Sequence, residues 1–214
     1  MIRPPEQHRQ AIDFSVEGDV RFLAHLDTVR LFARAAVRGR VAVRYSEGFN
    51  PHPRMSIPLP RPVGIASNAE RLVLELAEPL AEEEALRRLQ AQVPQGITLI
   101  RARRLAPGER CVPVSVTYRV NLPVQDPSAI EDRAAALLGA VTLPVQRTNP
   151  KSGRAKEVDL RPCLKRVAVD DGGVEMELSV TGGTLARPAE VMALLGLEAE
   201  PVNHRTRRLE IEWQ

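Results

Sequence analysis

Residues 21–67 read RFLAHLDTVRLFARAAVRGRVAVRYSEGFNPHPRMSIPLPRPVGIAS, and they decide how the first half of the chain is interpreted. Apolar side chains recur at helical spacing over residues 24–39, which predicts a helix there. Residues 41–45 alternate between apolar and polar side chains, as a strand does. Pro51 and Pro53 then prevent regular strand pairing, so we expect a loop that presents its side chains to a partner.

The flanking segments extend this pattern into a complete module. We expect a strand at residues 11–23 that is broken or turned at Glu17-Gly18-Asp19. Further strands are expected at residues 41–45, 69–77 and 97–105, and helices at residues 24–39 and 80–92. This β-α-β-β-α-β order is the split βαβ, or ferredoxin-like, unit. The Pro-Gly segment at residues 107–110 then predicts a linker.

The second half of the chain repeats the order without visible sequence identity. Residues 127–138 are expected to form a helix capped by Asp126 or Ser128, and residues 166–180 a hairpin. The predicted fold class is α+β, with two tandem ferredoxin-like modules whose antiparallel sheets carry helices on one face. The modules are expected at residues 11–106 and at residues 111–214, the second with the additional hairpin.

Composition narrows the class of protein. Aromatic residues make up 3% of the chain and hydrophobic residues 43%, so the core must be mainly aliphatic. We expect Phe14, Phe22 and Phe32 to lie in it. No apolar run approaches the roughly 20 residues that span a bilayer, and the N-terminal residues lack the apolar stretch of a signal peptide. We therefore expect a cytoplasmic protein that does not bind membranes.

The two cysteines, Cys111 and Cys163, are far apart in the sequence. No Cys-x-x-Cys pair or closely spaced three-cysteine cluster is present, so we expect reduced thiols without a metal site, an iron–sulfur cluster or another cofactor.

Charge is distributed unevenly along a chain whose formal net charge is +3. Residues 30–54 hold six arginines against Glu47 alone, and residues 146–166 hold seven basic residues against two acidic ones. Two such segments favour a surface for a polyanion. The alternative is that these side chains only form the solvent-exposed face of a helix.

Several strings together resemble a known family. They are Arg21-Phe22, His25-Leu26-Asp27, Arg34-Ala35, Tyr45-Ser46, Gly48-Phe49-Asn50-Pro51-His52-Pro53, Pro62-Val63-Gly64, Val158-Asp159-Leu160-Arg161-Pro162 and Arg187-Pro188. This set resembles the radical-SAM-linked proteins, an uncharacterised bacterial family with a domain of unknown function, over essentially the whole chain. The chain departs from the family at Ala24, where Ser is expected, and so loses a possible helix cap.

The resemblance implies association with a radical SAM enzyme, because members of the family are adjacent to or fused with one. This chain lacks the cysteines of a radical SAM cluster, so it would be the separately encoded partner. The resemblance transfers no activity.

Three residues, His25, Asp27 and His52, are candidates for a catalytic or binding role. His25 and Asp27 fall where the first strand passes into the first helix; Asp27 there can also stabilise the helix end. His52 is held between two prolines and can contact an anion or act as a base, since imidazole titrates near neutrality. The alternative for each is a purely structural role. Ligand types alone would allow a metal held by His25, His52 and one carboxylate, but the spacing in the sequence does not support such a site.

The candidates for RNA or anion binding are basic, aromatic and amide side chains from both basic segments. Arg30, Arg34 and Arg38 recur at four-residue spacing on the predicted helix, where they can follow phosphates or face water. The other candidates are Tyr45, Phe49, Asn50, His52, Arg54, Lys151, Arg154 and Lys156.

Three functions compete. The first is a non-catalytic partner of a radical SAM enzyme that binds or presents a structured RNA. The second is a metal-independent RNA-processing enzyme that uses His25 and His52, an idea that rests on fold analogy. The third is a module that docks only protein.

Overall fold

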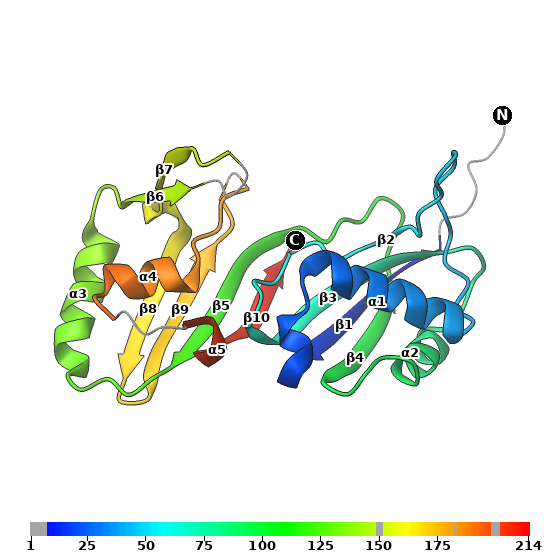
Figure 1. The fold of residues 1–214 in the computed structure, drawn as a ribbon, viewed down its shortest axis with the longest axis horizontal. Helices are drawn as coiled ribbons and strands as arrows, with labels where there is room; N and C mark the ends of the chain where they lie inside the picture. Colours follow the sequence, from blue (N-terminus) through cyan, green and yellow to red (C-terminus); the bar gives the residue numbers. More distant parts are fainter. Residues whose placement is uncertain (1–7, 149–151, 182, 198–201) are drawn as a thin grey trace. The chain divides into compact units, whose positions relative to one another are not determined.

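The structure is a computed structural model that describes residues 8–148, 152–181, 183–197 and 202–214 of the 214-residue chain. The fold is mixed α+β, with mostly antiparallel sheet and helices (Figure 1). The chain divides between Val112 and Pro113 into two compact units. Within the described ranges, no helix is both long and apolar enough to cross a membrane.

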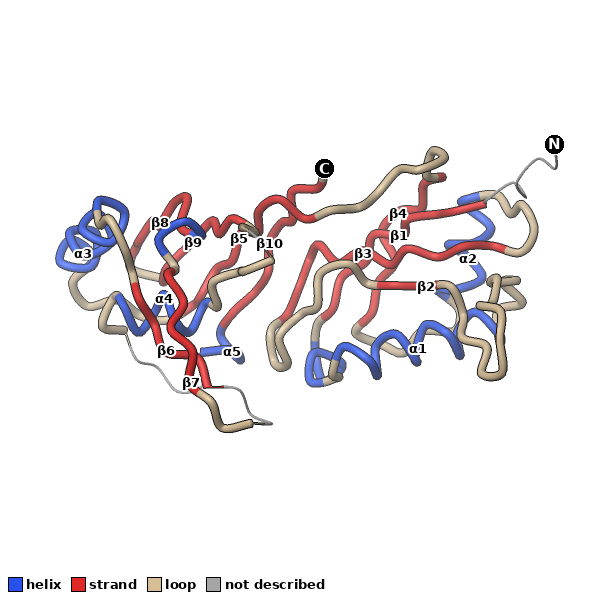
Figure 2. Tube along the Cα trace, turned by 90° about the horizontal axis from the view of Figure 1, so that it is seen from above, coloured by secondary structure: helices blue, strands red, loops and turns tan. Residues whose placement is uncertain are grey.

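Unit 1 contains an antiparallel sheet with the strand order β4-β1-β3-β2. Its elements are β1 (His8–Val16), the 3-10 helix η1 (Gly18–Phe22), α1 (His25–Arg38), β2 (Met55–Ser56), β3 (Ala66–Leu76), α2 (Glu82–Gln90) and β4 (Ile97–Arg104). Both predicted helices are present, each slightly shorter than expected. Figure 2 shows α1 running alongside β2.

Two predicted strands of unit 1 differ from the structure. The first ends at Val16, and the break expected at residues 17–19 is confirmed, because the backbone turns at Gly18, whose φ is +60°. The chain then forms η1, where the prediction continued the strand to residue 23. Residues 41–45 form no regular strand: Val43 makes an isolated bridge to Leu76 and Tyr45 one to Pro53.

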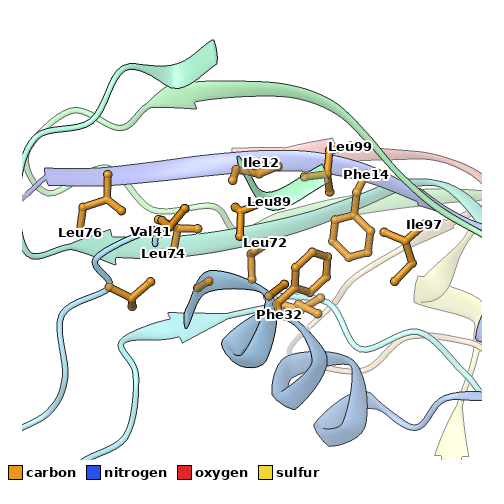
Figure 3. Close-up of a cluster of buried hydrophobic side chains, with 14 of the residues drawn as sticks. Ile12, Phe14, Phe32, Val41, Leu72, Leu74, Leu76, Leu89, Ile97 and Leu99 are labelled. Atoms are coloured by element: carbon orange, nitrogen blue, oxygen red, sulfur yellow. The ribbon is translucent and has the colours of Figure 1, made fainter. Parts of the chain in front are cut away.

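The core of unit 1 lies between the sheet and its two helices (Figure 3). Phe14 of β1 and Phe32 of α1 are fully buried, and their rings meet edge to face with centroids 4.8 Å apart. The prediction that Phe22 is also a core residue is wrong, since it is 44% exposed. It ends η1 at the surface, where the Arg21 guanidinium lies 5.1 Å from the centre of its ring.

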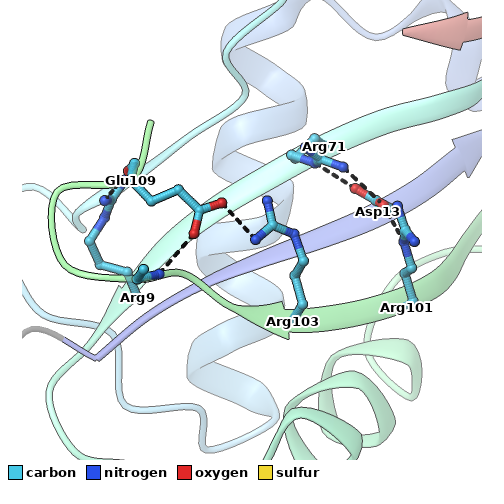
Figure 4. Close-up of polar contacts among 7 residues, drawn as sticks. Arg9, Asp13, Arg71, Arg101, Arg103 and Glu109 are labelled. Carbon is cyan, nitrogen blue, oxygen red and sulfur yellow. Dashed lines mark hydrogen bonds and ion pairs between the residues drawn. The ribbon is translucent and has the colours of Figure 1, made fainter. Parts of the chain in front are cut away.

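The opposite face of the same sheet carries a network of charged side chains (Figure 4). Arg71 donates two hydrogen bonds to Asp13, at 2.6 and 3.1 Å, and Arg101 donates a third at 2.6 Å. Burial alone would raise the pKa of Asp13, but these hydrogen bonds outweigh it and the pKa lies below its ordinary value. Leu105 and Cys111 pack on the same face, so the chain leaving β4 covers part of it.

Unit 2 contains a main antiparallel sheet in the order β10-β5-β9-β8 and a separate hairpin, β6–β7. Its elements are β5 (Pro113–Asn121), α3 (Pro127–Gly139), β6 (Pro144–Thr148), β7 (Ala155–Asp159), the 3-10 helix η2 (Arg161–Cys163), β8 (Leu164–Asp170), β9 (Gly173–Ser179), α4 (Pro188–Leu194), α5 (Val202–Arg205) and β10 (Thr206–Trp213).

Local signals in unit 2 are largely confirmed. Asp126 caps α3 by accepting a hydrogen bond from the Ala129 amide at 3.1 Å. The hairpin expected at residues 166–180 is the β8–β9 pair. The short helix α5 directly precedes the last strand, β10.

Candidate functional site

His25 is the first residue of α1 and lines a small pocket at the end of the unit 1 core. The pocket is also lined by Thr28, Arg61 and Glu70, all of which are buried. It contains about 10 Å³ of free space, which holds roughly one water molecule. A substrate does not fit there, so the geometry favours a packed polar cluster around His25.

Arg61 joins separate pieces of the quoted motifs. Its Nη1 donates to the carbonyl oxygens of Arg21 at 2.7 Å and of Ile65 at 2.6 Å. The Gly64 amide also donates to the Arg21 carbonyl, at 2.9 Å. The Arg21-Phe22 and Pro62-Val63-Gly64 strings therefore meet at one structural junction beside His25.

Sequence reasoning missed Thr28, Arg61 and Glu70. One signal was available for Glu70: it shares the helix-facing side of β3 with Leu72 and Leu74, where an apolar residue is expected. A carboxylate at such a position needs partners, because burying a charge alone is costly.

The second motif forms a loop beside the other end of α1. The Ser46 amide donates to the His52 carbonyl at 2.8 Å, and the His52 amide donates to Ser46 Oγ at 2.9 Å. Between these bonds the backbone turns at Gly48, whose φ is +117°. Phe49 is completely exposed, and Asn50 and the His52 side chain face solvent as well.

Glu75 of β3 fixes the two stems of this loop. Its carboxylate accepts hydrogen bonds from Arg44 at 2.9 Å and from Arg54 at 3.3 Å. Its backbone amide donates to the Arg54 carbonyl, and its carbonyl accepts from the Arg44 amide. Arg54, predicted as an anion contact, is thus engaged in holding the loop.

A shallow groove separates this loop from α1. It has a volume of about 360 Å³ and is lined by Ala33, Ala36, Val37, Arg40, Val41, Ala42, Val43, Tyr45, Pro53 and Met55. Tyr45 is 45% exposed and Val37 is 67% exposed. The walls are mostly apolar, and Arg40 supplies the single charge among these lining residues.

The three arginines predicted along α1 differ in their contacts. Arg30 pairs with Asp27 at 3.0 Å, and Arg38 donates to the Gln92 carbonyl at 3.0 Å. Arg34 is exposed and forms no ion pair with any residue that the structure describes.

Asp27 lies in the first turn of α1, where a carboxylate suits the helix dipole. Ala24, at the N-cap, makes no side-chain cap bond.

The structure does not bring His25 and His52 together. His25 begins α1, whereas the His52 loop packs beside its last turns, and a 14-residue helix is about 20 Å long. In the described part of the chain, no three His, Cys, Asp or Glu residues are grouped as metal ligands.

Most of the second basic segment serves the fold of unit 2. The occupied side chains and their partners are Arg147 with Glu190, Arg161 with the carbonyls of Leu138, Ala140 and Leu164, Lys165 with Glu177, and Arg166 with Glu175. Arg154 and Lys156 are exposed at the β6–β7 hairpin, and their side chains form no ion pair with a described residue. Lys151 lies outside the described residues.

These contacts define a mixed α+β protein whose exposed aromatic rings, Phe22, Tyr45 and Phe49, all lie in unit 1. The chain belongs to the family DUF2344, an uncharacterized protein conserved in bacteria, whose sequence model matches residues 9–188. The link to radical SAM enzymes stays a prediction.

No curated protein matches the chain. A crystal structure of an unknown protein from Galdieria sulphuraria is similar over 89% of this chain and 88% of its own, at 12% identity. Its TM-score of 0.28 is too low to support an argument about fold or function.

Proposed function

We propose that this chain is a non-catalytic partner of a separately encoded radical SAM enzyme, and that it binds or presents a structured RNA through unit 1. One observation carries the proposal: the aromatic rings of Tyr45 and Phe49 and the charge of Arg34 are exposed, and Arg34 forms no ion pair with a described residue. Aromatic rings beside basic groups are the usual means of holding unpaired RNA bases.

The strand orders support a finer description of the fold. In unit 1 the order β4-β1-β3-β2 accompanies the element order β-α-β-β-α-β. In unit 2 the order β10-β5-β9-β8 is equivalent once the β6–β7 hairpin is counted as an insertion. Both units are therefore proposed to be ferredoxin-like modules.

The proposed RNA surface differs from that of other ferredoxin-like sheets, which stack bases on exposed strand aromatics. In unit 1 the face opposite the helices is occupied by Asp13 with Arg71 and Arg101, and by the chain that follows β4. The exposed rings of Tyr45 and Phe49 lie instead on the loop that follows α1. The surface formed by α1 and this loop is called the α1–loop surface below.

An RNA-processing enzyme receives less support from the geometry. His25 lines a pocket too small for a substrate, and His52 lies beside the far end of α1. The two cannot act as one acid–base pair on a phosphodiester, because both groups must reach the same reacting atoms.

Equilibrium binding to structured RNA over a salt series tests the RNA proposal. Arg34→Ala should weaken binding and lower the salt slope by about 1 if Arg34 meets a phosphate. Arg110→Ala is the matched control, because Arg110 is another exposed arginine of unit 1 without an ion pair to a described residue. Equal effects of the two variants would place RNA elsewhere.

Absence of RNA binding at low salt would exclude the RNA proposal and leave protein docking. The enzyme partner is tested separately, by mixing the chain with the purified radical SAM protein and measuring complex formation by analytical ultracentrifugation. No complex, with or without RNA, would contradict the partnership.

A further inference from the structure

We propose that the groove between α1 and the 45–54 loop is a pocket for one unpaired base of the bound RNA, stacked on Tyr45 beside the Arg40 guanidinium. This inference rests on the proposed RNA function and names the part of the RNA that is recognised.

The shape and chemistry of the groove suit a flat ring. Its volume, about 360 Å³, falls in the range of small-ligand pockets. Val37, Val41 and Met55 supply apolar wall, and the partly exposed ring of Tyr45 supplies an aromatic face. Every nucleobase has two such apolar faces, but a paired base in a duplex hides them in the stack.

The charges around the groove are complementary to a nucleotide. Arg40 lines it, and Arg34 is exposed one turn before Val37 on α1. Arg44 and Arg54, on the stems of the loop, do not line the groove, and their charges are paired with Glu75. The carboxylate nearest to the groove in sequence is Glu47, in the exposed loop. An acidic protein segment would also match this charge, but it would not need an exposed aromatic face.

The backbone of Arg40 is a second, independent observation. Its φ is +52°, the left-handed region, which Gly and Asn adopt far more readily than Arg. The Arg88 guanidinium donates to the Arg40 carbonyl at 3.0 Å and holds this turn. A long cationic side chain at such a backbone position is explained if that side chain binds a ligand in the groove that it lines.

Two RNA hairpins of identical stem sequence provide the test. One carries a single bulged 2-aminopurine, and in the other the same 2-aminopurine is paired. The bulged hairpin should bind roughly 5- to 100-fold more tightly, the usual range for stacking one base, with quenched 2-aminopurine fluorescence. Tyr45→Ala and Arg40→Asn should remove most of this preference.

Val37→Glu is a variant in which a lost preference cannot be attributed to misfolding. Val37 is 67% exposed on α1, so its replacement leaves the core intact. It should also abolish the preference by placing a carboxylate at the groove. Arg110→Ala should leave the preference unchanged.

The outcomes separate the two proposals. Equal binding of both hairpins without quenching overturns the base pocket and leaves the RNA function standing. A preference that survives in Tyr45→Ala, Arg40→Asn and Val37→Glu also overturns the pocket, since the base is then held elsewhere. Failure of both hairpins to bind removes the RNA function together with the pocket, and favours a protein occupant.

Discussion

Replacing Glu75 distinguishes a binding surface that needs the shape of the 45–54 loop from one that needs only its charge. Glu75→Gln is nearly isosteric, but it removes the carboxylate that accepts from both Arg44 and Arg54. The net charge of the variant therefore rises by one, because a carboxylate is lost. The loop also loses the side chain that fixes its two stems. These two changes push RNA affinity in opposite directions, so the sign of the effect is informative.

The size of the structural effect follows from burial. The Glu75 side chain is 11% exposed, whereas those of Arg44 and Arg54 are 31% and 40% exposed. Breaking a buried ion pair by removing one partner costs about 3–5 kcal/mol, and an exposed pair contributes about 0–1 kcal/mol. These pairs are intermediate, so Glu75→Gln should lower the free energy of unfolding by roughly 1–3 kcal/mol.

Urea unfolding and RNA affinity at one fixed salt concentration are the two measurements. If the loop must be fixed, Glu75→Gln binds RNA more weakly in spite of its added charge. The control is Glu84→Gln on α2, which makes the same charge change where Glu84 pairs with Arg87 and Arg88. Tighter binding by both variants would refute the argument, because charge alone would then explain the affinity.

Three further predictions concern the stability of unit 1. Phe32→Ala should lower the unfolding free energy by roughly 3–5 kcal/mol, measured in urea, because it leaves a cavity beside Phe14; a loss below about 1 kcal/mol would contradict the packing described. Asp13 has a lowered pKa in the folded chain, so it stabilises above about pH 4, and this stability is lost as the pH falls through the folded pKa. Asp13→Asn should therefore destabilise at pH 7 and flatten the fall of urea midpoints below pH 4, and an unchanged pH profile would count against the network with Arg71. Arg40→Asn should keep or raise the thermal midpoint, because a left-handed Arg costs about 1–2 kcal/mol; a clear decrease would show that Arg40 is not strained.

The sequence predicted the helices of unit 1 well because their signal is local. Apolar spacing alone defines α1, and an acidic first turn followed by Pro94 nearly defines α2.

The strand predicted at residues 41–45 is absent for a physical reason. Alternation of apolar and polar residues indicates that one side of a segment is buried, as Val41 and Val43 are. It does not indicate which groups pair with the backbone of that segment. Here the stems of the loop are held mainly by one residue, Glu75.

The structure separates the predicted site residues of unit 1 into two places, the His25 pocket and the α1–loop surface. Residues 21–67 contain the α1–loop surface and part of the His25 pocket, which also needs Glu70, and the sequence could not separate the two. Arg61 contacts the Arg21 carbonyl across 40 positions, and no periodicity reports such a contact. Nor could spacing show that His25 and His52 lie beside opposite ends of α1.

Several basic residues of the second predicted segment are used by the fold, and this affects how RNA binding is measured. Arginine has five donors in a fixed fork, so it serves carbonyls and carboxylates of the fold as readily as phosphates. In the second basic segment, Arg161 donates to main-chain carbonyls and Arg147 pairs with Glu190. Only cations that meet phosphate release counterions, so the salt slope counts contacts rather than composition. A slope of a few units would thus agree with an α1–loop surface built around Arg34 and Arg40, whereas a slope near ten would require arginines that the fold already holds.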